Sequence, residues 1–465
     1  MSLVKTSPII AIATGNGNGN AGVGIVRISG EEEDVKALFQ KMFPGKEIKP
    51  RYAELLPIRD TQGQILDTGI VIYFRAPFSY TGESVLELQV HGGRVLLNWI
   101  VQEVLIFGKE FGLRQALPGE FTERAFLNGK IDLVQAEAVA DLIEANSRNA
   151  AKAASRSLTG EFSNKVNALN DALINLRVEV EAILDFPEEE IDFLSEYQSQ
   201  EKLEDIQNRL ESVLDSARQG EILRDGLRVA LVGETNVGKS SLLNYLAGEE
   251  IAIVSDIAGT TRDKIQTDLI ISGVPFHFVD TAGIRETEDR IEQIGIERTK
   301  QEISKADVIL EIRDIRDQQN KNKDSMQTAL KMIKGKDVPI ITVLNKVDLI
   351  STPLLNTKDV SRGTIIETSA VTGKGMQELK SELLKLAGFS ENQSIYMARE
   401  RHIHNLLNVK ESLKRAASYL NSTSPQLELF AEELRGASDE LGEITGKISS
   451  DDLLGKIFSG FCIGK

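Results

Sequence analysis

Hydrophobic and polar positions follow three different patterns along the chain. Up to residue 119, short β-branched runs alternate with Gly, Pro and Asn turns. The runs begin at Pro8, Val23, Thr68 and Ser84. This alternation predicts strands joined by turns, and we expect a small α+β domain over residues 1–119. From residue 120 to 222 the apolar positions are spaced by three and four instead, as at Leu203, Ile206 and Leu210, which predicts long helices.

The pattern changes again over residues 223–387, where apolar strands alternate with helices. The strands begin at Leu227, Pro275, Asp307 and Pro339. Such alternation predicts a parallel sheet covered by helices. Helical spacing returns over 388–465, in two apolar stripes. The first is Leu406, Val409, Leu413, Ala416 and Leu420, and the second is Leu427, Phe430, Leu434, Ala437, Leu441 and Ile444.

Two helical blocks therefore flank an α/β unit. We expect one discontinuous helical domain, 120–222 and 388–465, with the α/β unit inserted into it, because insertion at surface sites is tolerated where a domain's ends lie close together. Two separate helical domains are the alternative. A chain of 465 residues has room for about three domains.

Charge and cysteine content narrow the function classes. The net charge is 54 − 70 = −16, which opposes unselective binding to nucleic acid. A local basic cluster offers a nucleic-acid contact or only a solvated helix face. It consists of Arg399, Arg401, Lys410, Lys414 and Arg415. The one cysteine, Cys462, and the lack of a long apolar run or a secretory signal predict a cytoplasmic protein that does not cross a membrane.

A phosphate-binding loop follows the strand that begins at Leu227. Residues 233–240 match G-x-x-x-x-G-K-[ST] between a predicted strand and helix. Glycines let backbone N–H groups turn toward phosphate, Lys239 reaches the terminal phosphates, and Ser240 can ligate magnesium. The predicted phosphate-binding residues are Gly233, Asn236, Val237, Gly238, Lys239, Ser240 and Ser241.

Two further segments follow in the order that a nucleotide switch needs. The first is a loop in which a threonine could meet magnesium and the terminal phosphate. Its candidates are Ser255, Asp256, Ile257, Ala258, Gly259, Thr260 and Thr261. The second, at the end of a predicted strand, is Asp280, Thr281, Ala282 and Gly283. A backbone N–H at Gly283 could contact the terminal phosphate.

The base-binding segments predict guanine as the ligand. Asn345, Lys346 and Asp348 lie at the carboxyl end of a predicted strand. A carboxylate accepts from guanine's ring N–H and amine together, whereas adenine would leave it unpaired, so GTP is favoured over ATP. Backbone groups of Ser369, Ala370 and Val371 would close over the base. These residues resemble the GTPases of the translation-factor class.

Two details bear on hydrolysis. Ile284 follows Gly283 where many such enzymes carry a water-orienting glutamine, so another group must act, and Glu292 is our candidate. The alternative for Glu292 is a solvated carboxylate at a helix start. Because no arginine is evident beside the phosphates, a monovalent cation held by Asn236 and by carbonyls of 255–260 could supply the missing charge.

Segments in every predicted domain resemble one family. These segments are AGVGIVRISG, PGEFTERAFLNGKIDLVQAEAVADLI, DFPEEEIDF, GETNVGKSSLLN, AIVSDIAGTTRD, DTAGIRETEDRIEQIGIER, NKVD and SSDDLLGKIFSGFCIGK. They are similar to the MnmE (TrmE) family of tRNA-modification GTPases over essentially the whole chain. The resemblance implies an N-terminal folate-binding and dimerisation domain and a Ras-like GTPase domain.

The family resemblance also implies an activity and its partners. It implies a potassium-dependent GTPase, active as a homodimer, that works with the flavoprotein MnmG on carbon 5 of the wobble uridine of certain tRNAs. The 5,10-methylene form of tetrahydrofolate would supply a one-carbon unit, with the 5-formyl form as an analogue. A ribosome-assembly GTPase without covalent tRNA chemistry is the alternative function.

The resemblance further implies ligand residues. For folate these are Arg27, Glu87, Lys130 and Lys465; for potassium, Asn236, Ser255, Ile257 and Thr260; for magnesium, Ser240 and Thr261. Glu292 would activate water. Without the resemblance, Arg27 and Glu87 are ordinary strand charges and Lys130 is a solvated one. Cys462 is either a passive small residue or a chemically placed thiol beside the folate.

Overall fold

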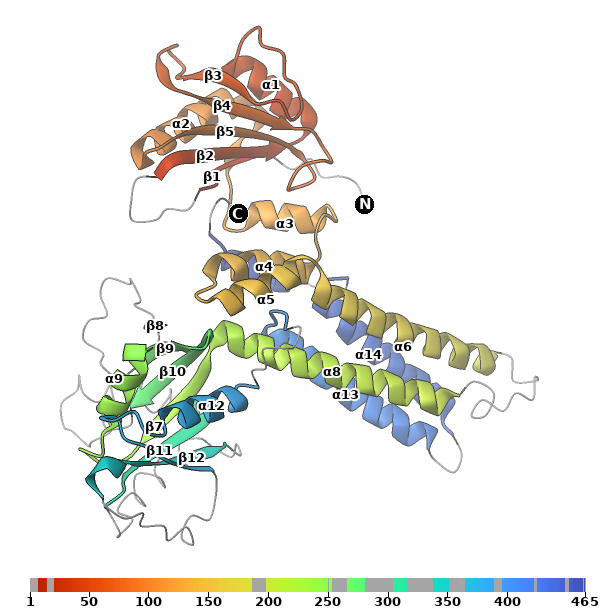
Figure 1. The fold of residues 1–465 in the computed structure, drawn as a ribbon. Helices are drawn as coiled ribbons and strands as arrows, with labels where there is room; N and C mark the ends of the chain where they lie inside the picture. The colour runs from red at the N-terminus through yellow and green to blue at the C-terminus, as the bar shows by residue number, and fades with distance from the viewer. Residues whose placement is uncertain are drawn as a thin grey trace, which may run out of the picture. The chain divides into compact units, whose positions relative to one another are not determined.

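A computed structural model describes most of the chain, and Figure 1 shows its ribbon. The described residues are 7–14, 21–185, 198–249, 251–252, 266–280, 304–316, 338–350, 364–388, 395–421, 425–447, 451–462 and 464. The chain divides into two compact units. Unit 1 comprises Met1–Ala140, Leu158–Ile174 and Leu434–Lys465, and unit 2 comprises Asp141–Ser157 and Asn175–Glu433. Among the described residues, no helix has the length and apolar character needed to span a bilayer.

Unit 1 is built on a six-stranded, mostly antiparallel sheet. Its strands are β1 (Ile9–Ile12), β2 (Ala21–Gly30), β3 (Glu54–Arg59), β4 (Ile65–Phe74), β5 (Ser84–Gly92) and β6 (Arg114–Gln115), in the order β3-β4-β5-β2-β1-β6. The β1–β6 pair is parallel. The strands expected from the runs at Pro8, Val23, Thr68 and Ser84 are all present.

The two faces of this sheet are covered differently. Helices α1 (Glu32–Met42) and α2 (Arg94–Phe107) lie on one face and bury an apolar core with it (Figure 1). On the other face, Phe121 of α3 (Glu120–Leu127) packs on Ile9 and Ala11. Because side chains alternate along a strand, residues of β2 and β5 on this second face lie beside α3.

Helical segments from distant parts of the sequence complete unit 1. They come from α4 (Leu133–Glu144), α6 (Glu161–Asp185), α14 (Leu427–Thr445) and α15 (Asp451–Ser459). Leu133 and Phe126 pack with Phe458 in one apolar cluster. The Ser438 hydroxyl lies 2.7 Å from Asn170 Oδ1. Helices on both sides of the α/β segment therefore share a core.

Unit 2 contains a seven-stranded sheet. Its strands are β7 (Leu227–Val232), β8 (Ile251–Ala252), β9 (Gln266–Ile271), β10 (Val274–Asp280), β11 (Val308–Asp314), β12 (Ile340–Asn345) and β13 (Thr364–Glu367), in the order β13-β12-β11-β7-β10-β9-β8. The pairs from β13 to β10 are parallel. Helices α9 (Lys239–Glu249) and α12 (Met376–Leu386) pack in the main apolar cluster of this sheet.

In unit 2, a long helix that precedes the sheet in the sequence packs on a long helix that follows it. Figure 1 shows α8 (Ser199–Asp225) alongside α13 (Glu400–Leu420). Tyr396 donates its hydroxyl to the Val213 carbonyl, and Gln207 Nε2 donates to the Leu413 carbonyl. The predicted stripes of both helices are buried. The expected architecture, an α/β nucleotide-binding fold inserted into a discontinuous helical arrangement, is confirmed, while the exact domain boundaries stay a prediction.

Candidate functional site

The phosphate loop joins β7 to α9 as the motif requires. Gly238 has φ 103°, and a Cβ at this position would lie 2.2 Å from Asn345 Nδ2, so only glycine fits there. Lys239, the first residue of α9, is buried, and its ammonium donates to the carbonyls of Gly233 (2.7 Å) and Glu234 (2.9 Å). The loop thus curves around the lysine at the N-terminus of a helix, where phosphate binds.

Asp280 lies at the end of β10, 3.9 Å from the Lys239 ammonium. Burial lowers the pKa of Lys239, and the charge of Asp280 partly opposes that shift. The cation and the carboxylate therefore meet at the carboxyl edge of neighbouring parallel strands. This is where ligands bind in such sheets.

Asp348 is fixed through a serine hydroxyl. It lies in the 3-10 turn Val347–Leu349, and Ser369 donates its hydroxyl to Asp348 Oδ1 at 2.5 Å. Ser369 in turn accepts from the backbone N–H groups of Val371 and Thr372. In the described part of the chain, the second oxygen of the exposed Asp348 carboxylate has no hydrogen-bond partner. It can accept from a base.

The base-binding and phosphate-binding loops are tied together. Asn345 Nδ2 donates to the Val237 carbonyl at 2.9 Å, and Lys346 donates to the Asn236 carbonyl at 2.5 Å. Lys346 also pairs with Asp314 at 3.0 Å. Hydrogen bonds from Arg316 and then Lys346 hold the pKa of Asp314 far below its usual value. This fixed carboxylate anchors the lysine, and the lysine anchors the loop.

Two of the expected cation ligands, Asn236 and Ser240, lie in the described part of the chain. They are exposed at the loop and at the start of α9, and both carry the oxygen donors that hard cations prefer. These two oxygen donors fit the expected ions. The remaining predicted residues lie outside the described part of the chain: Ser255, Asp256, Ile257, Ala258, Gly259, Thr260, Thr261, Thr281, Ala282, Gly283, Glu292 and Lys465.

Arg27 and Glu87 face each other on β2 and β5 of unit 1. They are register partners, and Arg27 Nε donates to Glu87 Oε1 at 2.8 Å. Their side chains are 22% and 11% exposed. Across the described residues, the two Nη groups of Arg27 and Oε2 of Glu87 have no hydrogen-bond partner. This Arg27–Glu87 pair offers donors and an acceptor side by side.

Two aromatic residues that sequence reasoning missed flank this pair. The Cζ atom of Arg27 lies 5.7 Å from the ring centroid of Tyr80 and 5.9 Å from that of Phe121. Lys130 donates to the Pro77 carbonyl at 3.0 Å, on the loop that carries Tyr80. Phe121 lies within a family-like segment, whereas no sequence signal marks Tyr80.

The C-terminal segment reaches the same part of unit 1. The backbone N–H of Gly119 donates to the Cys462 carbonyl at 3.4 Å, and the Cys462 side chain is exposed. A Cβ on Gly464 would lie 2.1 Å from the Ile12 carbonyl oxygen, so the chain passes against the end of β1. Arg27 pairs with Ala11 of that strand. The tail therefore lies one strand from the Arg27–Glu87 pair.

The predicted basic cluster is largely neutralised by carboxylates. Within unit 2, the ion pairs are Arg399–Asp141, Lys410–Glu211, Lys414–Glu411 and Arg415–Glu433. Arg399, Lys410, Lys414 and Arg415 therefore form ion pairs within the protein. These ion pairs favour the interpretation of the basic cluster as a helix face over its interpretation as a nucleic-acid surface.

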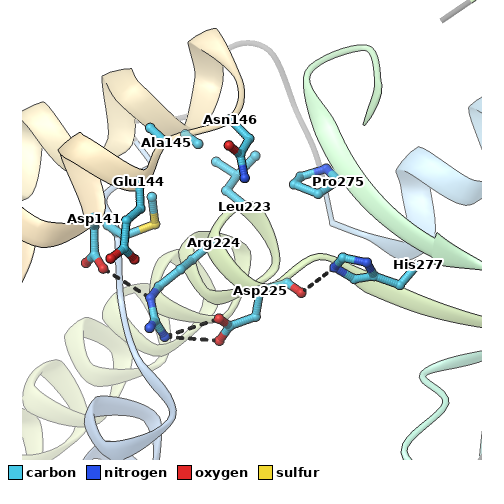
Figure 2. A pocket seen from close by; sticks show the side chains of 11 residues that line it. Asp141, Glu144, Ala145, Asn146, Leu223, Arg224, Asp225, Pro275 and His277 are labelled. Carbon is cyan, nitrogen blue, oxygen red and sulfur yellow. Dashed lines mark hydrogen bonds and ion pairs between the residues drawn. The ribbon is translucent and has the colours of Figure 1, made fainter. Parts of the chain in front are cut away.

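A cavity of about 170 Å³ lies in unit 2 where helices meet the inserted sheet (Figure 2). Asp141 accepts from Arg224 (3.1 Å) and Arg399 (2.8 Å), and its side chain is 3% exposed. His277 of β10 contacts the Asp225 carbonyl at the end of α8, at 2.9 Å. These contacts belong to the helix–sheet junction and lie at the opposite end of β7 from the phosphate loop.

The phosphate loop, the Asp280 strand end and the Asp348 loop, carried on this sheet, define a P-loop GTPase. Two protein-family models match the chain. The family model described as "GTP-binding protein TrmE N-terminus" matches residues 8–130, and the family model described as "MnmE helical domain" matches residues 133–462. The chain belongs to the MnmE/TrmE family.

Its relatives match over their full length. The "tRNA modification GTPase MnmE" of Bordetella petrii is 52% identical over 459 residues, 98% of each chain. The protein of the same name from Burkholderia cenocepacia is 50% identical over 471 residues, 100% of each chain. A crystal structure of Aquifex aeolicus Era is 30% identical in sequence, matches 40% of this chain and 66% of its own chain, and has a TM-score of 0.28.

Proposed function

We propose that the chain is a GTP-hydrolysing tRNA modification enzyme. With a flavoprotein partner, MnmG in this family, it adds a (carboxymethyl)aminomethyl group to carbon 5 of the wobble uridine of certain tRNAs, using a folate one-carbon unit. Relatives about 50% identical over the full length are named tRNA modification GTPases. The observation that carries the proposal is the open Arg27–Glu87 pair in a chain that also holds complete phosphate and guanine loops.

In the GTPase reaction, Asp348 selects guanine and Lys239 neutralises charge on the terminal phosphates. Ser240 and Thr261 hold magnesium, while Asn236, with Ser255, Ile257 and Thr260, holds potassium. When bound, the two cations supply positive charge at the phosphates. Glu292 positions the attacking water. The exposed amide of Asn236, beside a loop that Lys346 fixes, supports its assignment.

The folate derivative binds at the Arg27–Glu87 pair. A pterin presents a ring N–H and an amine on one edge, which a carboxylate such as Glu87 can accept. Arg27 offers two Nη groups to an acceptor on the ligand, and Lys130 and Lys465 offer charge to its glutamate tail. The 5,10-methylene form is the one-carbon donor, and Cys462, on the adjacent tail, takes part in the chemistry.

The working assembly is a cytoplasmic homodimer that contacts tRNA and the flavoprotein. Residues 1–119 bind folate and dimerise, 120–222 with 388–465 form the helical domain, and 223–387 form the GTPase domain. Exposed apolar side chains on one side of α2 support a contact there, because large exposed apolar patches usually mark interfaces. They are Val95, Trp99 and Ile106.

The test is binding of 5-formyltetrahydrofolate, measured by isothermal titration calorimetry on the full-length protein. Glu87→Ala should weaken binding by about tenfold or more, since a hydrogen bond to a charged group contributes about 1.5–3 kcal/mol. Glu54→Ala is the matched control, because Glu54 is also a strand carboxylate paired with a cation, Lys46 at 3.0 Å. It should bind like the wild type.

If the wild type shows no saturable binding at millimolar ligand, the folate site proposed at Arg27 and Glu87 is wrong. The chain would remain a GTPase, and the alternative of a regulatory GTPase of the ribosome-assembly kind would be reopened.

A further inference from the structure

We propose that Tyr80 is a positioning residue of the folate site. Together with Phe121, its ring holds the guanidinium of Arg27 in one orientation, with the two Nη groups presented to the ligand. We call Tyr80 and Phe121 the aromatic clamp. The proposal rests on the folate site proposed above and adds to it a residue that contacts Arg27.

Three contacts restrict Arg27. The ring centroids of Tyr80 and Phe121 lie 5.7 and 5.9 Å from Cζ, both within the range of a cation–π interaction. The third contact is the hydrogen bond from Nε to Glu87. A guanidinium held at Nε and contacted by two rings has little freedom to rotate. Its remaining donors, both Nη groups, are left for a ligand.

The clamp is itself fixed on the sheet side. Phe121 is fully buried against Ile9 and Ala11, so its ring cannot turn away. The Tyr80 hydroxyl lies 2.9 Å from the hydroxyl of Thr122, which is also fully buried. Phe121 and Thr122 are neighbours on α3, so one helix positions both members of the clamp.

The loop that carries Tyr80 is held from a second direction. Asn128 Nδ2 donates to the Thr81 carbonyl at 2.8 Å, and Lys130 donates to the Pro77 carbonyl at 3.0 Å. Tyrosine has an ordinary pKa of about 10 and burial raises the pKa of Tyr80 further, so the phenol is neutral at physiological pH. The ring therefore has a fixed place, although Tyr80 is 37% exposed.

Orientation matters because a free arginine must lose rotamer freedom when it binds a ligand. A side chain that is already ordered loses less, so binding is tighter for the same contacts. Tyr80 thus contributes to affinity through Arg27. This role needs an aromatic face, whereas a purely structural role would need only apolar volume.

The experiment compares three substitutions by calorimetry with 5-formyltetrahydrofolate. Tyr80→Ala and Tyr80→Leu should each weaken binding by about tenfold, the effect of losing one well-packed cation–π contact. Tyr80→Phe keeps the ring and loses only the hydroxyl contact, so it should stay within about threefold of the wild type. Retained thermal stability and basal GTP hydrolysis in each variant show that the protein has folded.

Tyr52→Ala is the matched control. Tyr52 is 58% exposed, and Lys49 lies over its ring at 5.9 Å, so the substitution removes the same kind of contact elsewhere in unit 1. Its affinity should equal that of the wild type.

Two results would overturn the inference. Equal affinity of Tyr80→Ala and the wild type would show that the ring does not position Arg27. Equal affinity of Tyr80→Leu and Tyr80→Phe would show that only volume matters. In either case, the folate site would still stand if Glu87→Ala weakens binding as predicted. A wild type that binds no folate would remove the site and the inference together.

Discussion

Single residues in left-handed conformations shape the nucleotide loops. Asn236 and Lys346 have φ 68°, and Gly238 has φ 103°. Asparagine tolerates this region better than most residues, so Asn236 can hold both the turn and an exposed amide. Lys346 fastens the carbonyl of the same residue. The backbone carbonyl of Asn236 therefore fixes the loop, while its side-chain amide stays exposed.

The positive φ of Asn236 makes glycine the suitable substitution for testing whether its side chain binds potassium. Asn236→Gly removes the amide oxygen without the strain that alanine would suffer at positive φ. GTP hydrolysis in potassium should fall by about 10², the usual cost of losing one stabiliser of transition-state charge. Hydrolysis in sodium should change little. The measurement is steady-state phosphate release in the two salts.

Thr235→Ala, one residue earlier in the loop, is the control and should keep the potassium response. Equal hydrolysis by the wild type in sodium and potassium would contradict the cation proposal.

At the scale of elements, the β9–β10 hairpin joins the sheet to the end of α8. His277 Nδ1 lies 2.7 Å from Asp268 Oδ1, and Nε2 lies 2.9 Å from the Asp225 carbonyl. Both partners are acceptors, so both nitrogens donate only when the ring is protonated. The hydrogen bond to Asp268 is the main cause of the raised pKa of His277, and burial opposes it. The protonated ring also faces the negative end of the α8 dipole.

The raised pKa makes stability depend on pH. In the unfolded chain the imidazole has a pKa of about 6.5, so the contribution of His277 is complete below that pH. It is lost as pH rises through the higher pKa of the folded protein. His277→Gln should therefore lower the thermal unfolding temperature most in mildly acidic buffer, and the difference from the wild type should shrink as pH increases.

His91→Gln is the control, since His91 lies 2.9 Å from Asp67 but is well exposed. Its effect should be small at every pH, because solvent screens exposed pairs. A His277→Gln effect that is constant with pH would show that the imidazole contributes only packing.

At the scale of the whole molecule, Asp141 connects three segments around the insertion. It lies on α4 and accepts from Arg224 at the end of α8 and from Arg399 just before α13 (Figure 2 labels Asp141 and Arg224). These are the helices that enter and leave the inserted fold. One buried carboxylate on α4 thus holds both the segment that enters the inserted fold and the segment that leaves it.

Asp141→Ala leaves two arginines without their shared partner. The protein should lose about 2 kcal/mol of unfolding free energy, less than for a fully buried pair because both arginines are partly exposed. GTP affinity should be unchanged, since the phosphate loop lies at the other end of β7. Urea unfolding followed by circular dichroism measures the unfolding free energy, and nucleotide titration measures the GTP affinity.

Glu144→Ala, an exposed carboxylate one helical turn away, should cost less than about 0.5 kcal/mol. A loss of GTP affinity in Asp141→Ala that matched its loss of stability would show that the junction and the nucleotide loops unfold together.

The sequence by itself determined what is local. Strand alternation and helical stripes predicted the elements, because burial of one face imposes a period of two or of three to four. The phosphate loop was evident because glycines, lysine and serine act within eight consecutive residues. The guanine specificity of Asp348 followed from one carboxylate at a strand end. The expected residues outside the described part of the chain stay predictions.

Only the tertiary structure decided what depends on register and packing across the chain. Arg27 and Glu87 are 60 residues apart, and Lys346 and the Asn236 carbonyl are 110 apart. No local pattern encodes which strands pair or which loops touch. The Tyr80 hydroxyl contacts Thr122 of α3, which is 42 residues away in the sequence. From sequence alone the basic cluster at α13 was either a nucleic-acid contact or a solvated helix face. Its ion pairs with carboxylates favour the helix face, because a sequence gives charges but not their partners.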